Sequence, residues 1–169
     1  VFSISPKELG LTLIYDVAHN IAKIEEHVVN GKRLKLVVHR KGATRAFPPH
    51  NPDVPPAYRE IGQPVLLPGD VGRYSFLLVG QEKSMDMSFG SACHGAGRLM
   101  SRTKAKEFVR KEGLEKVLGG LVVVARGKGT VAEEIPQAYK DVSEVAYVVH
   151  SLGIARLVAR FKPLGTLKG

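Results

Sequence analysis

The sequence predicts an α+β fold in which mostly antiparallel β-sheets are covered by a few helices. Three observations support this class: short β-prone segments lie between glycine- and proline-rich turns, an Asn-Gly pair separates two β-prone segments, and helical patterns are few. No internal repeat, linker or low-complexity stretch divides the 169 residues. This length suits a single domain.

The first elements are a capped turn, a strand and a hairpin. Ser5, Pro6 and Glu8 form a capping-box pattern for a short helical turn that ends at Gly10. Residues 11–14 are predicted to be a short buried strand. Residues 20–29 and 32–39 flank Asn30-Gly31, a pair that favours the positive φ angles of a two-residue hairpin turn.

The middle of the chain is predicted to contain a loop and a strand pair. Residues 47–56 include five prolines, which exclude a helix or a central strand and indicate an extended surface loop. Residues 64–67 and 74–79 are rich in β-forming residues and flank a glycine-rich turn. They are expected to pair as two further strands.

The last part of the chain alternates helices and strands. The patterns predict, in order, a loop over 89–97, a helix from there to about 111, an apolar strand at 121–124, a helix from about 143 to 153, and a closing strand within 155–168.

Composition excludes several classes of protein. With 44% hydrophobic residues the chain can build a core, and it shows neither a run of about 18 apolar residues nor a secretory signal. We therefore expect a soluble, cytoplasmic protein with no membrane association. The single cysteine, Cys93, excludes an internal disulfide and a cysteine-based zinc cluster. The chain begins at Val1 without a methionine, so we expect a fragment. A net charge of +9 favours anionic partners such as nucleic acid.

Two of the six histidines stand in unusual surroundings, whereas His27, His39 and His150 are expected to be structural. His19 lies three residues after Asp16 and directly before Asn20, where a strand leaves the core. Metal ligands often occupy such positions, although a structural role is equally compatible. His94 lies among small residues, with a helix expected directly after it. A phosphate held there would face an imidazole that can act as a nucleophile, and the alternative is a glycine-rich turn with a structural histidine.

Basic residues recur every four positions after this loop. Arg98, Arg102, Lys106 and Arg110 would form one stripe along the expected helix. Such a stripe suits a phosphate backbone, and a solvated helix face is the alternative.

Five ordered motifs together resemble the RtcB family of RNA-splicing ligases. They are Tyr15-Asp16-Val17-Ala18-His19-Asn20, Arg40-Lys41-Gly42-Ala43-Thr44-Arg45-Ala46-Phe47, Pro68-Gly69-Asp70-Val71-Gly72, His94-Gly95-Ala96-Gly97-Arg98 and Lys168-Gly169. The resemblance implies that residues 1–169 are the C-terminal portion of one RtcB-like catalytic domain. It also implies joining of RNA 3′-phosphate or 2′,3′-cyclic phosphate ends to 5′-hydroxyl ends, as in tRNA splicing and RNA repair, with GTP, manganese and a histidine-linked GMP.

The resemblance assigns roles to individual residues. His94 would be the nucleophile that takes GMP, His19 a manganese ligand, and Arg98 and Arg102 would face RNA or polyphosphate. Several family members carry serine at position 70, so the contact of Asp70 is expected to differ, because a carboxylate near a phosphate needs a base, metal or cation beside it. The nucleotide-binding residues would be Asn20, Pro68, Gly69, Asp70, Val71, Ser75, Gly95, Ala96, Gly97, Tyr139 and Lys168.

The family's other metal ligands would lie in an N-terminal part that this sequence does not include. We therefore expect the 169-residue chain alone to be inactive and its partners to be RNA and that N-terminal part; whether an activating protein such as archease takes part stays open. Three alternatives remain: a non-catalytic basic RNA-binding module, a metal-dependent phosphoesterase using Asp16, His19 and His94, and a structural partner subunit.

Overall fold

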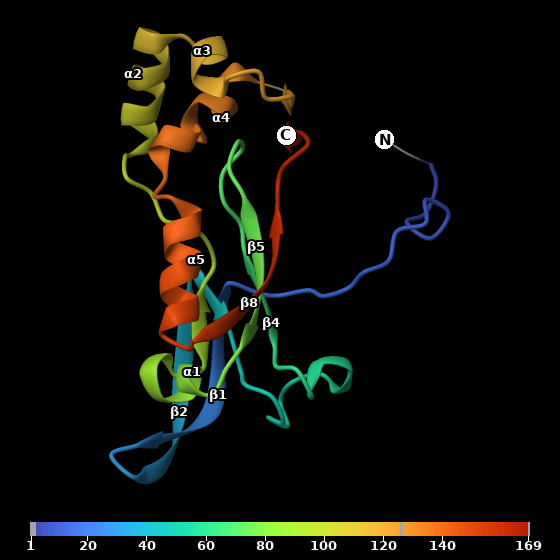
Figure 1. Ribbon diagram of the computed structural model, residues 1–169, viewed down its shortest axis with the longest axis vertical. Helices are drawn as coiled ribbons and strands as arrows, with labels where there is room; N and C mark the ends of the chain where they lie inside the picture. The colour runs from blue at the N-terminus through green and yellow to red at the C-terminus, as the bar shows by residue number, and fades with distance from the viewer. Residues whose placement is uncertain (1–2, 126, 169) are drawn as a thin grey trace.

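The computed structural model describes residues 3–125 and 127–168, except for the side chains of residues 128, 167 and 168. The described residues confirm the α+β class, with antiparallel sheets and one parallel strand pair, β7 (Val123–Ala125) with β9 (Thr166–Lys168). A group of helices occupies one end of the molecule and a long hairpin extends from the other (Figure 1). No helix in this part of the chain is long and apolar enough to cross a membrane.

The hairpin consists of β1 (Asn20–Val29) and β2 (Lys32–Lys41), as predicted. Asn30 and Gly31 have φ angles of 51° and 75°, which are those of a type I′ turn. One face of the hairpin packs on the body of the molecule and buries charged residues.

Arg40 is the most buried of these charged residues, since only 2% of it is exposed. Its guanidinium donates to both carboxylate oxygens of Glu25 at 2.8 Å, to Ser91 Oγ at 2.8 Å and to the Phe89 carbonyl at 2.8 Å. His27 lies beside the same carboxylate, with its Nε2 3.2 Å from a Glu25 oxygen. The network fastens the hairpin to the segment that precedes the glycine-rich loop, and His27 has the structural role expected of it.

The main core lies between a three-stranded sheet and a helix. β4 (Pro64–Leu67), β5 (Ser75–Gly80) and β8 (Ala155–Phe161) pair antiparallel in that order, and α5 (Val142–Ser151) covers one face. These elements confirm the predicted strand pair, late helix and closing strand. The core residues they contribute are Val65, Leu67, Phe76, Leu78, Val142, Ala146, Val149 and Ala155.

A short second sheet joins β3 (Ala43–Arg45) to β6 (Ser91–Cys93), and the sequence patterns predicted neither strand. Each strand is three residues long, too short for a periodic pattern to be visible. A six-residue helix, α1 (Lys83–Ser88), precedes β6 and was also not predicted. The pairing aligns Ala43 with Cys93 and so brings the segments around residues 42 and 94 together.

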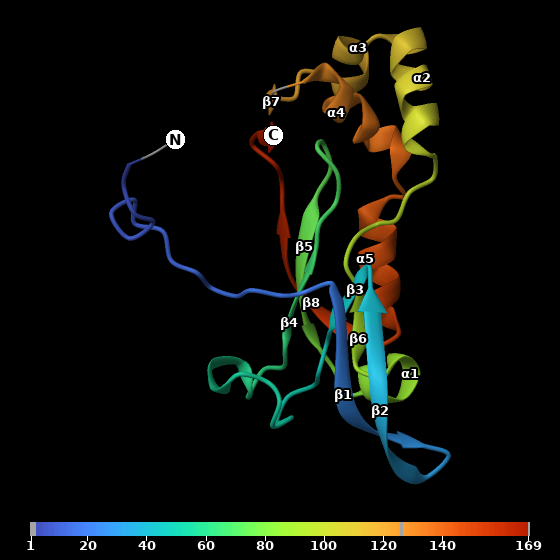
Figure 2. The same ribbon diagram turned by 180° about the vertical axis from the view of Figure 1, so that it is seen from behind.

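The helical end is formed by α2 (Arg102–Glu112), α3 (Leu114–Leu118) and α4 (Lys128–Glu133). They enclose a small second core of Ala105, Val117, Ile135 and Ala138. The back view shows these helices beyond the end of the central sheet, beside the chain terminus (Figure 2). The predicted strand at 121–124 is found one to two residues later, as β7.

Two expectations about the first half of the chain need correction. Residues 11–14 form no strand, and their apolar side chains are exposed, because this segment runs away from the body without a partner strand among the described residues. The capping box before it does form, since Ser5 N and Oγ donate to Glu8, but only as turns. Residues 47–56 form a loop, as predicted, but the loop is not extended, because turns lie at 49–50 and 52–53 and a 3₁₀ helix begins at Pro56. Phe47 and Val54 within it are buried rather than at the surface.

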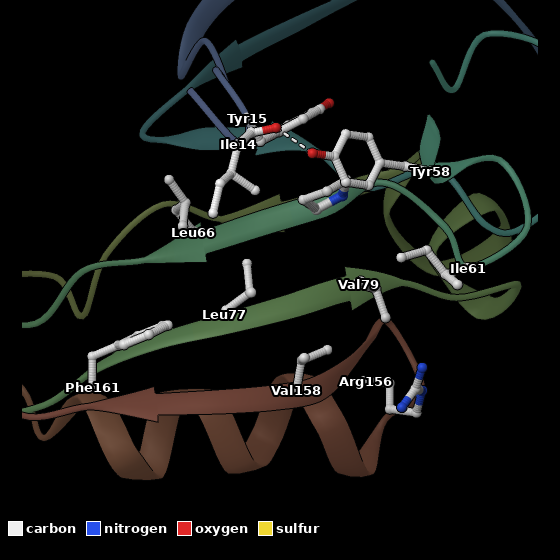
Figure 3. Close-up of a pocket in the computed structure, with 11 residues that line it drawn as sticks. Ile14, Tyr15, Tyr58, Ile61, Leu66, Leu77, Val79, Arg156, Val158 and Phe161 are labelled. Carbon is white, nitrogen blue, oxygen red and sulfur yellow. Dashed lines mark hydrogen bonds between the residues drawn. The ribbon is translucent and has the colours of Figure 1, made fainter. Parts of the chain in front are cut away.

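The face of the β4-β5-β8 sheet opposite α5 is apolar and open. Leu66, Val158 and Phe161 are each at least 40% exposed on it. Together with Ile14 and Tyr58, which meet through a hydrogen bond from the Tyr58 hydroxyl to the Ile14 carbonyl, they line a groove of about 330 Å³ (Figure 3). We call this surface the apolar groove.

Candidate active site

His94 directly follows β6, where the second sheet ends. Its backbone N–H donates to the carbonyl of Gly42 at 3.1 Å, and the N–H of Gly42 donates to the carbonyl of His19 at 2.9 Å. One glycine therefore connects the backbones of the two candidate histidines. The φ angle of +67° at Gly42 belongs to the left-handed region that favours glycine.

The two imidazole rings are stacked. Their centroids are 4.1 Å apart and their planes differ by 16°. His19 is exposed, whereas His94 is half-buried and its Nδ1 is buried without a hydrogen-bond partner in the described part of the chain. Sequence reasoning singled out both histidines, and the structure brings them into contact.

The surroundings of His94 favour a neutral imidazole. Burial lowers its pKa below the ordinary 6.5, the charge of His19 lowers it further, and a hydrogen bond from the ring to the Leu66 backbone opposes the change. Near neutral pH the ring therefore keeps a lone pair, which is what nucleophilic attack requires.

A cavity of about 290 Å³ opens beside the His94 ring. Two backbone segments rich in small residues form much of its wall, one before β5 and one after His94. The lining residues are Gly42, Pro68, Gly69, His94, Gly95, Ala96, Gly97 and Tyr139. Most of the predicted nucleotide-binding residues thus share one cavity.

Gly69 is required by close packing of the chain. A Cβ atom at this position would lie 2.0 Å from the carbonyl oxygen of Tyr74. The Gly69 N–H donates to Ser75 Oγ at 3.2 Å, so Ser75 supports the turn from within the protein. The turn is consequently narrow, with its backbone at the edge of the cavity.

The helix expected directly after His94 begins later. α2 starts at Arg102 with Ser101 as its N-cap, and Arg98 forms a bridge with Tyr139 in extended conformation. The prediction that a helix N-terminus lies beside the imidazole was wrong, and Arg98 is not part of the helical stripe. The backbone hydrogen bonds between residues 97–99 and 138–140 hold this segment extended.

Arg98 contacts the chain itself in this structure. Its guanidinium lies 4.7 Å from the centre of the Tyr139 ring and donates to the Tyr139 hydroxyl at 2.8 Å and to the Glu133 carbonyl at 2.6 Å. Arg102 is exposed and pairs with Glu133 at 3.3 Å. The RNA contacts predicted for both arginines stay predictions.

Tyr139 forms a wall of the cavity and is held on several sides. Its hydroxyl donates to Glu134 in a short hydrogen bond. Burial raises the pKa of Tyr139 to about 12, and the hydrogen bond and charge of Glu134 act in the same direction. The phenol is therefore protonated over the physiological pH range.

The Asp70 carboxylate faces into the protein. Its side chain is fully buried, Oδ1 accepts from the backbone N–H groups of Gly72 and Arg73, and Oδ2 accepts from Arg73 Nε at 2.5 Å. The expectation that this carboxylate needs a neighbouring cation is met by Arg73. Sequence reasoning missed Arg73, although its position three residues after Asp70 is a usable signal.

Three other predicted nucleotide-binding residues lie outside the cavity lining. Asn20 is exposed at the start of β1, and Val71 is buried. Lys168 ends β9, and its side chain lies outside the part of the chain that the structure describes.

The described residues do not by themselves complete a metal site. No three His, Cys, Asp or Glu side chains gather there in an arrangement that could hold a metal ion. His19, with an exposed imidazole at the rim of the site, can supply one ligand. A bound manganese ion would need further ligands from elsewhere.

Comparison with known proteins gives a consistent result. The family model described as tRNA-splicing ligase RtcB matches residues 1–169. Proteins named tRNA-splicing ligase RtcB from Thermococcus kodakarensis, Archaeoglobus fulgidus and Aeropyrum pernix are 55%, 54% and 53% identical to this chain over its whole length. The chain covers 36%, 36% and 35% of these relatives, about a third of their length.

Proposed function

Because this chain belongs to the tRNA-splicing ligase RtcB family, we propose that it supplies the nucleotide-transfer residues of an RNA ligase. The observation that best supports the proposal is the His94 imidazole, kept neutral under a stacked His19 and placed at a glycine-lined cavity. The substrates would be an RNA 3′-phosphate or 2′,3′-cyclic phosphate end, a 5′-hydroxyl end and GTP.

In the proposed step, the unprotonated ring nitrogen of His94 attacks the α-phosphorus of GTP. A nitrogen–phosphorus bond forms, the bond from that phosphorus to the bridging oxygen breaks, and pyrophosphate leaves with the electron pair. The imidazole then carries GMP, and its positive charge is lost with a proton to solvent. Joining of the RNA ends would proceed through this histidine-linked GMP.

The protein's part in this step is to bind and orient the nucleotide. Backbone N–H groups of the glycine-rich segments can approach phosphate oxygens closely because no side chains intervene. Tyr139 offers a flat ring for the base. Arg102, which is exposed at the start of α2, would add positive charge for the polyphosphate or RNA.

We propose that His19 contributes one ligand to a manganese site whose other ligands come from the remainder of the ligase. A divalent cation at this position would disperse the negative charge of the polyphosphate. His19 itself would orient the ion next to the cavity, and its stacking on His94 fixes the position of the ring.

The remainder of the ligase is also the proposed occupant of the apolar groove. The relatives are nearly three times as long as this chain, so a family-length protein has ample additional sequence to cover it. Leu11 and Leu13, which precede the groove residue Ile14 in the chain, are 64% and 79% exposed and are uncovered as well. Removal of such apolar surface from water favours association.

A covalent labelling experiment tests the proposed function. A ligase of full family length that contains this segment is incubated with GTP and manganese, and the intact mass is measured. We expect a GMP adduct that resists base and is lost in acid, as a phosphoramidate should be, and that is absent from the His94→Ala variant. His39→Ala, an exposed histidine on β2, is the matched control and should be labelled normally.

The same experiment separates the alternatives. If the intact ligase binds RNA but takes up no GMP, the chain belongs to a binding module and the proposal fails. Phosphate release from RNA ends without GTP would instead support a phosphoesterase. The 169-residue chain incubated alone should not be labelled.

A further inference from the structure

The cavity beside His94 lies between two segments that are far apart in the sequence. One is the turn that contains Pro68 and Gly69, and the other ends at Tyr139. Side chains that connect these segments therefore contribute to the width of the cavity into which His94 opens. Such a connection exists in the described structure, outside the cavity lining.

Arg73 makes this connection with its guanidinium group. Nη2 donates to the Pro136 carbonyl at 2.6 Å and to the Tyr139 carbonyl at 2.9 Å, while Nε donates to Asp70 at 2.5 Å. The planar guanidinium suits this task because its donors diverge in fixed directions. The backbone of Tyr139 is thereby tied to the turn on the opposite side of the cavity.

Asp70 holds the guanidinium in place. Its side chain has no exposed surface, and its two oxygens accept three hydrogen bonds, all from Gly72 and Arg73. A buried carboxylate that is satisfied in this way is costly to disturb. The turn and the cation thus form one rigid unit.

Other contacts fix the Tyr139 ring. Arg98 stacks against it and donates to its hydroxyl, which in turn donates to Glu134. These groups determine the ring orientation. The backbone that bears the ring is held by Arg73 on one side and by the backbone hydrogen bonds between residues 97–99 and 138–140 on the other. Loss of the Arg73 contacts would therefore also displace the ring relative to Arg98 and Glu134.

We propose that Asp70 and Arg73 are positioning residues that hold Tyr139 at the correct distance from His94 to receive the nucleotide base. This inference rests on the proposed function, because it assigns the base-binding wall of the same cavity. Neither residue touches the nucleotide. They act through the backbone of Tyr139.

The test measures GMP transfer to His94 at varied GTP concentration in the full-length ligase. We expect Arg73→Met to raise KM for GTP roughly tenfold, while the rate at saturating GTP falls less than about threefold. Arg73→Lys keeps the charge but lacks the divergent donors, so its KM for GTP should lie between those of the unaltered ligase and of Arg73→Met. Lys140→Met, at the exposed neighbour of Tyr139, is the charge-matched control and should leave KM unchanged.

A double variant shows whether Arg73 acts through Tyr139. On a Tyr139→Ala background, Arg73→Met should cause no further increase in KM, because residues that act through one another are not additive. An equal increase on both backgrounds would mean that Arg73 contacts the nucleotide directly, and would overturn the inference.

A spectroscopic titration tests the positioning role of Arg73 without relying on GMP transfer. The pKa of Tyr139 is measured from its tyrosinate absorbance, isolated by subtracting a titration of Tyr139→Phe. It should fall from about 12 towards 10 in Arg73→Met and in Asp70→Asn. An unchanged titration in both variants would overturn the positioning role. If the unaltered ligase takes up no GMP, the proposed function fails, and the titration still decides whether Arg73 positions Tyr139.

Discussion

The imidazole rings of His19 and His94 lie 4.1 Å apart and nearly parallel, although the two residues come from distant parts of the sequence. Two stacked imidazoles cannot both be protonated without repulsion between like charges at short range. The arrangement therefore lowers the pKa of His94 in addition to the effect of burial. Burial and this contact together favour a neutral imidazole at the proposed nucleophile, next to the candidate metal ligand.

Replacement of His19 should separate stacking from metal binding. His19→Ala removes the ring and its nitrogen atoms, and His19→Phe restores a stacked ring without a ligand atom. We expect both variants to lose GMP transfer in the full-length ligase by roughly tenfold or more, since loss of a metal-binding contact typically costs at least that much. Recovery of transfer in His19→Phe alone would show that stacking, and not a ligand nitrogen, is what His19 supplies.

Stability should decrease at alkaline pH because of Tyr139. Its pKa is raised to about 12 in the folded protein, above the ordinary value of 10. The folded state therefore holds a proton that the unfolded state loses, and the stabilisation present below pH 10 is lost as the pH rises towards 12. When urea unfolding is measured over this pH range, the free energy of unfolding should decrease less with pH for Tyr139→Phe than for the unaltered protein. Equal decreases would contradict the prediction.

Loss of the Arg40 side chain should destabilise the fold severely. Arg40→Met leaves the Glu25 carboxylate buried without its cation, at a cost of about 3–5 kcal/mol in the free energy of unfolding. Arg33→Met is the matched control, because the exposed pair of Arg33 with Glu26 should contribute less than about 1 kcal/mol. Denaturant unfolding gives the free energy of unfolding of both variants. Similar decreases would show that burial does not strengthen the contribution of the Arg40 pair to stability.

A methyl group at Gly69 should disturb the turn beside the cavity. Gly69→Ala places a Cβ atom where the Tyr74 carbonyl oxygen lies, so the backbone must shift. We expect a marked fall in both thermal stability and GMP transfer. Gly129→Ala, at a position where a Cβ atom meets nothing within 4 Å, should change neither. A fully active and stable Gly69→Ala protein would exclude close packing as the reason for this glycine.

A charge in the apolar groove should impair assembly with the remainder of the ligase. Val158→Lys introduces an ammonium group on the open face of the sheet, where it would be buried by the proposed occupant. Tyr147→Lys, on an exposed position of α5, is the control. Association of this chain with the separately produced remainder can be followed by size-exclusion chromatography. Equal association of both variants, or self-association of this chain through the groove, would refute the proposed occupant.

Short sequence patterns predicted the elements whose conformation depends on neighbouring residues. Asn30-Gly31 predicted the hairpin because few residue pairs adopt its turn, and the capping box at Ser5 and Glu8 formed as expected. The apolar residues at 11–14 were misinterpreted, because an apolar run does not show whether a partner strand is present. Strands β3 and β6 were missed for the same reason, since their pairing depends on residues nearly fifty positions apart.

The sequence predicted which residues form the candidate site better than it predicted how they are held in place. Motif resemblance identified His19, His94 and most of the cavity lining, but not how these residues are held. Arg98 was placed on a helix from its spacing, whereas tertiary hydrogen bonds keep it extended beside Tyr139. The role of Asp70 depends on its contact with Arg73, which the five motifs do not include.

Gly42, whose backbone N–H and carbonyl connect the backbones of His19 and His94, makes the proposed site dependent on the progress of folding. Contacts between distant parts of a chain form late, because loop closure costs entropy before the contacts compensate for it. An incompletely folded chain therefore has its two imidazoles far apart, with no shared cavity between them. The proposed nucleotide site therefore forms only after these distant segments have come together.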